Sequence, residues 1–304
     1  MDQMSERMPI AGSELTSSRI PGETANLTGS GTSCTSCAAA STRNSQIPAS
    51  PYVYAIGAIE PRFPRVSVER ELAQAVGRAD ATNLTDRQAL REVLQARQNR
   101  YLVRQLCWVM TIEGLETYIV VPRDSADYDL LIEGLRPSPS PLDVDVVIGF
   151  RGPIASPEMC NGLTLPILIF DALYSFDRDS FVKAIPRPEK IAAKEFNAAA
   201  EELFDRIMQL TDNDGTSDKD RALNYLAVRY PAIYATAAEA LAGNASMTGV
   251  HVQVSPLSGV RKIVEVIFSF THRTTDVTGK HFVRVDVTEE FPFLVTKMSP
   301  YYDR

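Results

Sequence analysis

Four side chains of this sequence could together hold a metal ion: Cys107, Cys160, His272 and His281. Thiolate sulfur and imidazole nitrogen are the ligands that zinc prefers. His272 and His281 flank a turn region containing Gly279, so pairing across a hairpin would bring them close together. The alternative is a pair of edge-strand histidines and two reduced, structural thiols in apolar or turn contexts. The sequence therefore predicts no cofactor, with zinc as the alternative.

A second group of residues could bind a peptide. Arg87, Arg91 and Arg97 belong to a basic cluster that could bind an acidic peptide, although a solvated helix face is the commoner explanation of such a cluster. The loop 152–162 is dense in Pro and Gly, and it would deliver Glu158 to the surface. We predict a peptide-binding role for these three arginines and Glu158.

No set of residues in the sequence predicts a particular reaction. We find no catalytic triad, phosphate loop or strong metal motif, so no catalytic residue is predicted. Asp143 and Asp145 lie at alternate positions of an expected strand, which directs both carboxylates to one face, but strand-start aspartates are usually solvated. Cys34 and Cys37 have the C-x-x-C spacing of zinc and redox sites without a second ligand pair or a strand-helix context.

Charge and hydropathy exclude several classes of partner. The net charge of −7 opposes sequence-independent binding to nucleic acid or to anionic lipid, because both need a basic surface. No apolar run reaches the roughly eighteen residues of a membrane span, and the first residues lack a basic region followed by a hydrophobic segment. We expect a cytoplasmic protein that binds a small molecule, a peptide or another protein.

These candidate residues must be positioned by a mixed set of strands and helices. Residues 1–50 are rich in Ser, Thr, Gly and Ala without periodicity, and we expect a disordered tail there. Residues 51–188 read as an α/β part, with a strand hairpin around Trp108 and amphipathic helices before it. Residues 189–304 read as a helical segment followed by a sheet, with a boundary at Pro186 and Pro188.

The overall prediction is an α+β fold with a helical middle and a C-terminal antiparallel β-meander. The meander is expected because the last sixty or so residues change from a helical period to a period of two, in segments such as KIVEVIFSF and HFVRVDV. Such strands need one another to be stable.

Several long motifs in one order resemble a known family. The segments RQLCWVMTIEGLETYIVVPRD, DVDVVIGFRGPIASPEMCNGL, IPRPEKI, RALNYLAVRYPAIY and RVDVTEEFPFLVTKMSPYYDR resemble the C-terminal domain of PatG- and PatA-type cyanobactin maturation proteases, from about Tyr52 to Arg304. In that family the domain follows a subtilisin-like protease or macrocyclase unit. Only about fifty residues precede it here, so the resemblance implies a stand-alone domain without the protease or macrocyclase catalytic set.

The resemblance implies a function in the biosynthesis of ribosomally made, post-translationally modified peptides. We expect a non-catalytic accessory domain that binds a precursor peptide or one of its maturation enzymes. A metal-binding or Cys-dependent enzyme acting on such a peptide is the alternative, and an oligomerisation domain whose edge strands pair between subunits is a further one. The Ser/Thr/Cys-rich tail could also mimic a substrate of heterocyclising enzymes.

Overall fold

The structure is a computed structural model, and it describes residues 51–78, 85–141, 143–209 and 213–302. The expected tail, residues 1–50, lies outside the described residues. The first part of the chain forms β1 (Tyr52–Arg62), α1 (Val66–Arg78), α2 (Asp86–Gln95), η1 (Arg97–Asn99), α3 (Arg100–Gln105), β2 (Cys107–Ile112), β3 (Leu115–Pro122), η2 (Ser125–Asp127), α4 (Tyr128–Gly134), β4 (Asp143–Ile154) and β5 (Pro166–Asp177). The rest forms α5 (Arg178–Ala184), α6 (Ala193–Met208), α7 (Asp218–Arg229), α8 (Ala232–Ala242), β6 (Ala245–Val254), β7 (Ile263–His272), β8 (Thr278–Asp286) and β9 (Phe293–Pro300).

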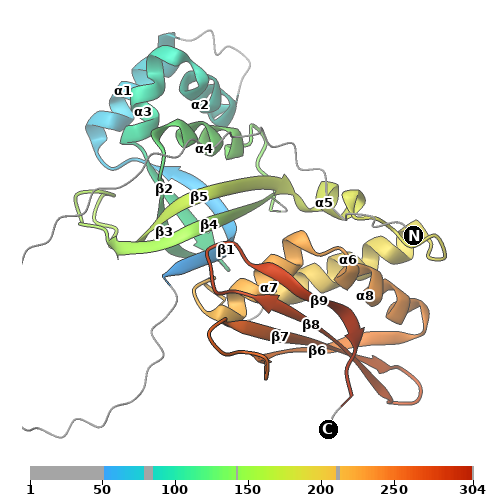
Figure 1. The fold of residues 1–304 in the computed structure, drawn as a ribbon. Helices are drawn as coiled ribbons and strands as arrows, with labels where there is room; N and C mark the ends of the chain where they lie inside the picture. Colours follow the sequence, from blue (N-terminus) through green and yellow to red (C-terminus); the bar gives the residue numbers. More distant parts are fainter. Residues whose placement is uncertain (1–50, 79–84, 142, 210–212, 303–304) are drawn as a thin grey trace, which may run out of the picture. The chain divides into compact units, whose positions relative to one another are not determined.

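The first five strands close into a barrel with the order β1-β2-β3-β5-β4 (Figure 1). All neighbouring strands are antiparallel except β3 and β5, which run parallel from the pair Ile119 and Ile167 onward. The hairpin turn between β2 and β3 lies at Glu113 and Gly114, both at positive φ, as the turn signal in the sequence predicts. Closure removes the exposed edges that an open five-stranded sheet would leave.

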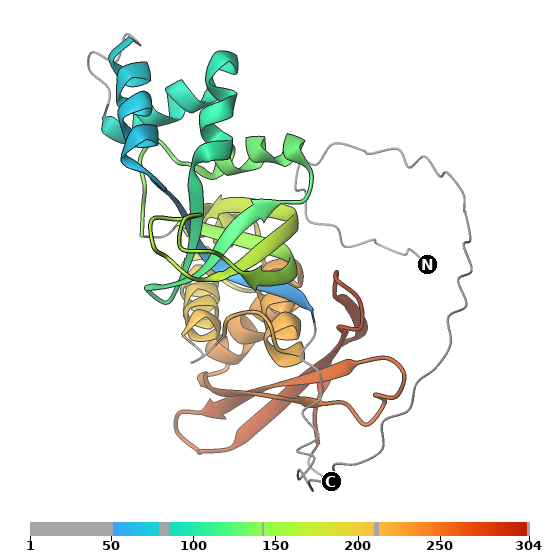
Figure 2. The ribbon, with the colours of Figure 1, turned by 90° about the vertical axis from the view of Figure 1, so that its left-hand side faces the viewer.

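Alternation along the barrel strands separates the core from the outer wall. Trp108 and Met110 on β2, with Tyr118 on β3, belong to the main hydrophobic core, whereas Cys107 and Val109 point the other way. The core continues into the apolar sides of α1 to α4, which lie together at one end of the barrel (Figures 1 and 2). Helices and barrel therefore share one core.

Helix α7 joins the barrel to the second sheet. It packs against β1 of the barrel and against β6 and β7 of the second sheet. Residues on all its sides are buried, as expected of a helix with a partner on each face. Asn224 donates to the main-chain oxygen of Tyr54 on β1, and the Tyr54 N–H donates to the Gly215 oxygen just before the helix.

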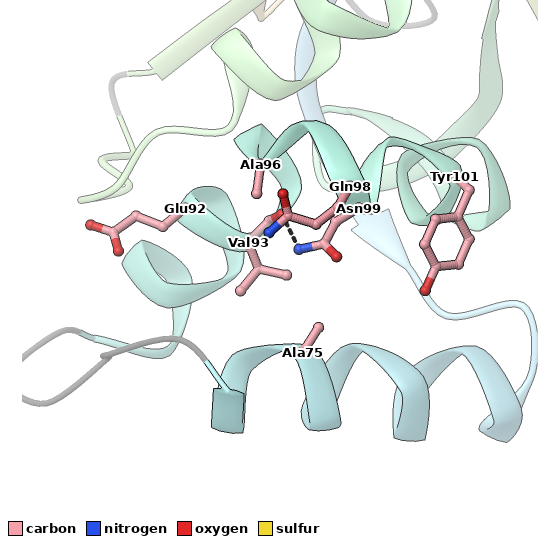
Figure 3. A pocket seen from close by; sticks show the side chains of 7 residues that line it. All are labelled: Ala75, Glu92, Val93, Ala96, Gln98, Asn99 and Tyr101. Carbon is pink, nitrogen blue, oxygen red and sulfur yellow. Dashed lines mark hydrogen bonds between the residues drawn. The ribbon is translucent and has the colours of Figure 1, made fainter.

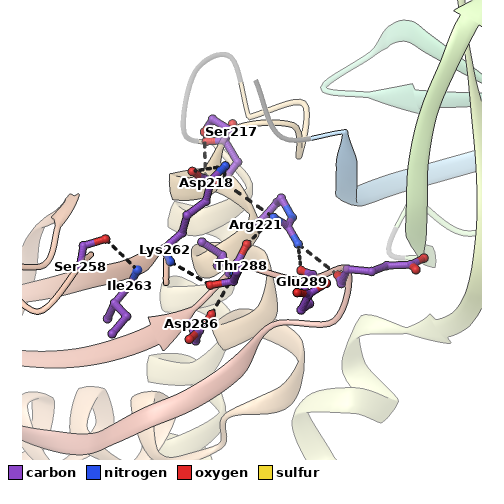
Figure 4. Close-up of polar contacts among 12 residues, drawn as sticks. Ser217, Asp218, Arg221, Ser258, Lys262, Ile263, Asp286, Thr288 and Glu289 are labelled. Carbon is purple, nitrogen blue, oxygen red and sulfur yellow. Dashed lines mark hydrogen bonds and ion pairs between the residues drawn. The ribbon is translucent and has the colours of Figure 1, made fainter. Parts of the chain in front are cut away.

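Arg221 joins α7 to the turn after β8 (Figure 4). Its side chain is fully buried, and its guanidinium donates to the main-chain oxygens of Val287, Glu289 and Glu290. The same guanidinium lies over the ring of Tyr52 on β1. A buried arginine is tolerated because its donors are taken up by carbonyl oxygens.

The second sheet is the antiparallel meander β6-β7-β8-β9. Val266 and Phe268 of β7 lie on one face, whereas Glu265 lies on the other, where Arg284 and Gln253 bind its carboxylate. The α+β class and the C-terminal meander are thus confirmed. The closed barrel was not foreseen. Within the described residues, no helix is long and apolar enough to cross a membrane.

Candidate functional site

A disulfide holds the β4–β5 connection against the barrel wall. Cys107 at the start of β2 and Cys160 in the connection are bonded, with their Cα atoms 5.6 Å apart. Our expectation of two reduced thiols is therefore wrong in this structure. The disulfide forms because the alternation of side chains along β2 turns Cys107 outward. Residues 155–165 lie over that outer face and bring Cys160 to it.

The connection covers the outer wall as a small second core. Cys107, Val109 and Ile119 of the wall pack with Ala155 and Cys160 of the connection, and all five are buried. Asn161 and Gly162 adopt positive φ and turn the chain back toward β5. Loop 155–163 is consequently a fixed element and presents a defined surface on either side.

Two open grooves flank this loop. One, of about 400 Å³, is lined by Arg62, Phe63, Arg65, Val66, Glu69, Glu116, Cys160, Asn161 and Leu163. The other, of about 380 Å³, is lined by Pro64, Arg65, Ser67, Val68, Gln105, Glu158 and Met159. Arg65 lines both, so the grooves meet along the link between β1 and α1.

The grooves combine exposed apolar side chains with charges of both signs. Phe63, Val66 and Met159 are 37%, 59% and 38% exposed, so three large apolar side chains reach solvent around these adjoining grooves. Glu158 is fully solvated, and hydrogen bonds from its own main chain and from Ser156 lower its pKa. It therefore stands at the groove as a carboxylate, opposite in charge to Arg65. We call these two grooves and loop 155–163 the loop-155 surface.

A third groove lies between α1 and the α2–α3 segment (Figure 3). It measures about 550 Å³, and Ala75, Val93 and Ala96 give it an apolar lining. Asn99 is engaged because its side-chain amide donates to the Val93 oxygen, and Tyr101 donates to Glu71. Fewer large apolar side chains are exposed here than at the loop-155 surface.

The structure separates the residues predicted to bind a peptide. Arg87 pairs with Glu60 and donates to the Arg136 oxygen, so it joins α2 to the barrel. Arg91 is half-buried, and Arg97 is exposed on η1. Glu158 lines a groove that none of these arginines lines. Only Glu158 of the four lies at the loop-155 surface.

The predicted metal ligands are not brought together. Cys107 and Cys160 use their sulfur atoms in the disulfide, in the barrel. His281 lies on β8 against Phe270, and His272 accepts main-chain N–H groups of Thr274 and Thr275 in a turn. Among the described residues, no three His, Cys, Asp or Glu side chains form a group that could hold a metal ion.

The paired aspartates have structural partners. Asp145 is buried, and it accepts hydrogen bonds from the Ile59 N–H and the Ser175 hydroxyl. Asp143 pairs with Arg136 and accepts from the Ser140 N–H. Cys34 and Cys37 lie outside the described residues.

Sequence reasoning missed Phe63, Val66 and Met159. One signal was available in the run Pro61-Arg62-Phe63-Pro64-Arg65, where a large ring stands between two prolines and two arginines. Such a segment has no periodicity, so it does not say whether the ring is buried.

Comparison with known proteins adds a family and a fold. Residues 190–301 match the family model described as PatG C-terminal. A solved structure titled "PatG Domain of Unknown Function" resembles this chain with a TM-score of 0.65 and 20% sequence identity, over 83% of this chain and 99% of its own length. At that identity the likeness shows the fold. No curated protein matches the chain. Residues 190–301 are thus similar to the PatG C-terminal family, and the chain shares the fold of the solved PatG domain.

Proposed function

We propose that this chain is a non-catalytic accessory domain in the biosynthesis of ribosomally made, post-translationally modified peptides of the cyanobactin type. It binds a precursor peptide or one of its processing enzymes at the loop-155 surface. The observation that carries the proposal is the exposure of Phe63, Val66 and Met159 in two adjoining grooves. Rigid grooves with apolar anchors and a few charges are the usual form of a peptide-binding surface.

The disulfide favours binding because it fixes one wall of each groove before the peptide arrives. Ordering a loop on association costs free energy, and a preformed wall avoids that cost. Arg65 and Glu158 would set the direction of a bound peptide, since each attracts the opposite charge. The loop-155 surface thus fits an extended segment with apolar side chains and charges of both signs.

The proposal places the chain in the cytoplasm, where thiol reductants act on accessible disulfides. Cys107 and Cys160 are only 4% and 3% exposed, which limits the approach of a reductant to either sulfur. A buried disulfide is therefore compatible with that compartment.

The test is a binding titration with a fluorescently labelled precursor peptide and, separately, with each modifying enzyme of the pathway. Phe63→Ala should weaken binding by about tenfold or more, because removal of a hot-spot side chain from an interface costs about 2 kcal/mol or more. Phe291→Ala is the matched control: Phe291 is 50% exposed in the turn before β9, and its truncation should leave affinity unchanged.

Two outcomes would contradict the proposal. If the wild-type chain shows no saturable binding to any of these molecules, the accessory function fails. If binding is saturable but Phe63→Ala and Phe291→Ala have equal effects, the loop-155 surface is not the site. Val66→Ser, compared with Val260→Ser on the β6–β7 turn, repeats the comparison at a second pair of exposed residues.

A further inference from the structure

The second sheet has two edges, β6 and β9, and they differ in how their main-chain groups are used. Figure 1 shows β6 as the lowest strand of the sheet. A strand at a sheet edge presents a row of unpaired N–H and C=O groups, which can pair with another strand. An added strand could therefore pair with β6 or β9 only where these groups are free.

The edge at β9 is covered by α7 and the residue that follows it. The outward N–H of Met298 donates to the Tyr230 hydroxyl, 2.9 Å away. Tyr225 bonds to the main chain at Leu294. Added strands are therefore blocked on this side.

The edge at β6 is open over its second half. The Ser255 N–H donates to the Ile263 oxygen of β7, so odd-numbered residues of β6 direct their main-chain groups toward β7. The main-chain groups of Val250, Val252 and Val254 consequently point away from the sheet. No partner for these groups is found among the residues that the structure describes.

The β6 strand also lacks the usual protection of an edge. Residues 245–254, ASMTGVHVQV, contain no proline and no Lys, Arg, Asp or Glu. Native edges normally carry charges, prolines or bulges that prevent pairing. The bulge at Met247 to Gly249 lies at the start of β6, so it leaves Val250 to Val254 regular. Val254 is 63% exposed although its neighbours in the sheet are valines.

We propose that β6 is an interaction surface for a second copy of this chain, which adds its own β6 antiparallel to it. The register is centred on Val252, so that Val252 faces its counterpart and Val250 faces Val254 of the other copy. Each of these facing pairs exchanges two main-chain hydrogen bonds. His251 then lies beside Gln253 of the other copy on the opposite face.

Two features favour a second copy as the occupant. Antiparallel self-pairing in this register keeps valines beside valines and polar residues beside polar residues, so both faces of the sheet continue across the interface. An uncharged strand also meets no like-charge repulsion when it pairs with itself. Because β9 is covered, pairing through β6 ends at two copies and forms a closed dimer, whereas two open edges would permit fibres.

The test is sedimentation velocity of the full chain over about two decades of concentration, from which a dimer dissociation constant follows. Val254→Lys introduces the charge that protects natural edges, at an already exposed position. It should raise the dissociation constant about tenfold or more. Val277→Lys is the matched control: Val277 is 67% exposed in the β7–β8 turn, and its substitution should leave the constant unchanged.

Val252→Pro gives a second variant, because it removes an outward N–H and leaves the hydrogen bonds to β7 in place. It should also produce a monomer, and circular dichroism checks that both variants are folded. A wild-type chain that is monomeric at every concentration overturns the proposal, as does a dimer that both variants leave intact. If the chain is monomeric and Val254→Lys instead abolishes binding of a labelled precursor peptide, the occupant of the edge is a peptide strand.

Discussion

Asp145 is a carboxylate that could serve in catalysis, but its hydrogen bonds stabilise the fold. Burial raises its pKa to about 6, although hydrogen bonds from Ser175 and from the Ile59 N–H act in the opposite direction. The carboxyl accepts two hydrogen bonds that join β4 to β5 and to β1. A strand-start aspartate with these contacts is a link between strands, so its position beside Asp143 does not make a catalytic pair.

Asp145→Asn should change how stability depends on pH. Since the folded-state pKa lies above the unfolded value of about 3.9, the protonated carboxyl stabilises the fold; this contribution is complete below about pH 4 and is lost as pH rises through about 6. The loss amounts to roughly 2 to 3 kcal/mol for a shift of this size. Urea unfolding between about pH 4 and pH 7 measures the difference between the variant and the wild type.

Asp143→Asn is the control for this experiment, because it removes a carboxylate from the same strand and leaves Asp145 in place. It should keep the decline in stability between these pH values. Parallel pH profiles for the wild type and Asp145→Asn would show that the Asp145 carboxyl does not favour its protonated form in the fold.

At the scale of elements, the disulfide determines whether loop 155–163 is a fixed surface. Cys107 and Cys160 are 53 residues apart in sequence. A cross-link across that length lowers the entropy of the unfolded chain and stabilises the folded protein by about 4 kcal/mol in the loop-closure model. The apolar packing of Ala155 and its neighbours also holds the loop against the barrel.

The double variant Cys107→Ala/Cys160→Ala should lower the free energy of unfolding by about 4 kcal/mol. It should also become insensitive to reductant, whereas the wild type should lose a similar amount of stability when reduced. Chemical unfolding with and without a phosphine reductant measures both effects. Peptide mass spectrometry of the non-reduced wild type provides the direct control, and recovery of unlinked Cys107 and Cys160 peptides would contradict the bond.

At the scale of the whole molecule, α7 joins the barrel to the meander, and Gly215, just before α7, lies against Tyr54 of β1. Gly215 has a φ of 79°, and its oxygen accepts the Tyr54 N–H. A Cβ at this position would lie 2.4 Å from the Tyr54 oxygen. Neither the backbone conformation nor the space therefore permits a side chain here.

Gly215→Ala should destabilise the protein by roughly 1 to 3 kcal/mol from backbone strain, with a further loss from the contact with Tyr54. Gly77→Ala on α1 is the matched control. No atom lies within 4 Å of its added Cβ, and alanine stabilises a helix by roughly 0.5 to 1 kcal/mol. Thermal unfolding compares the two, and a Gly215→Ala protein as stable as the wild type would refute this account of the junction.

The sequence predicted those features that depend on local pattern. The amphipathic pattern marked α2, which Thr85 caps by accepting from the Gln88 N–H, and the period of two marked β6 to β9. Barrel closure was not predictable in this way, because it depends on the parallel pairing of β3 with β5, which are joined through η2, α4 and β4. The sequence of neither strand indicates which strand it pairs with.

The candidate site was less predictable for the same reason. Cys107 and Cys160 were singled out, but their spacing does not distinguish a disulfide from two separate thiols. Arg87 looked available on its helix, yet it pairs with Glu60 of β1, a contact between distant segments. Phe63 and Met159 come to line adjoining grooves only through the fold.

The contact of α7 with the barrel has a consequence for how sequences with this fold can vary. The segment matched by the PatG C-terminal family begins at residue 190, yet Asn224 within it donates to the main chain of Tyr54, far outside it. A main-chain acceptor is present whatever side chain the strand carries. The side chains of the barrel can therefore change while its main chain still provides the same hydrogen-bond acceptor for α7. Transfer of the 190–301 segment to another protein would require a main-chain oxygen in that place to accept from Asn224.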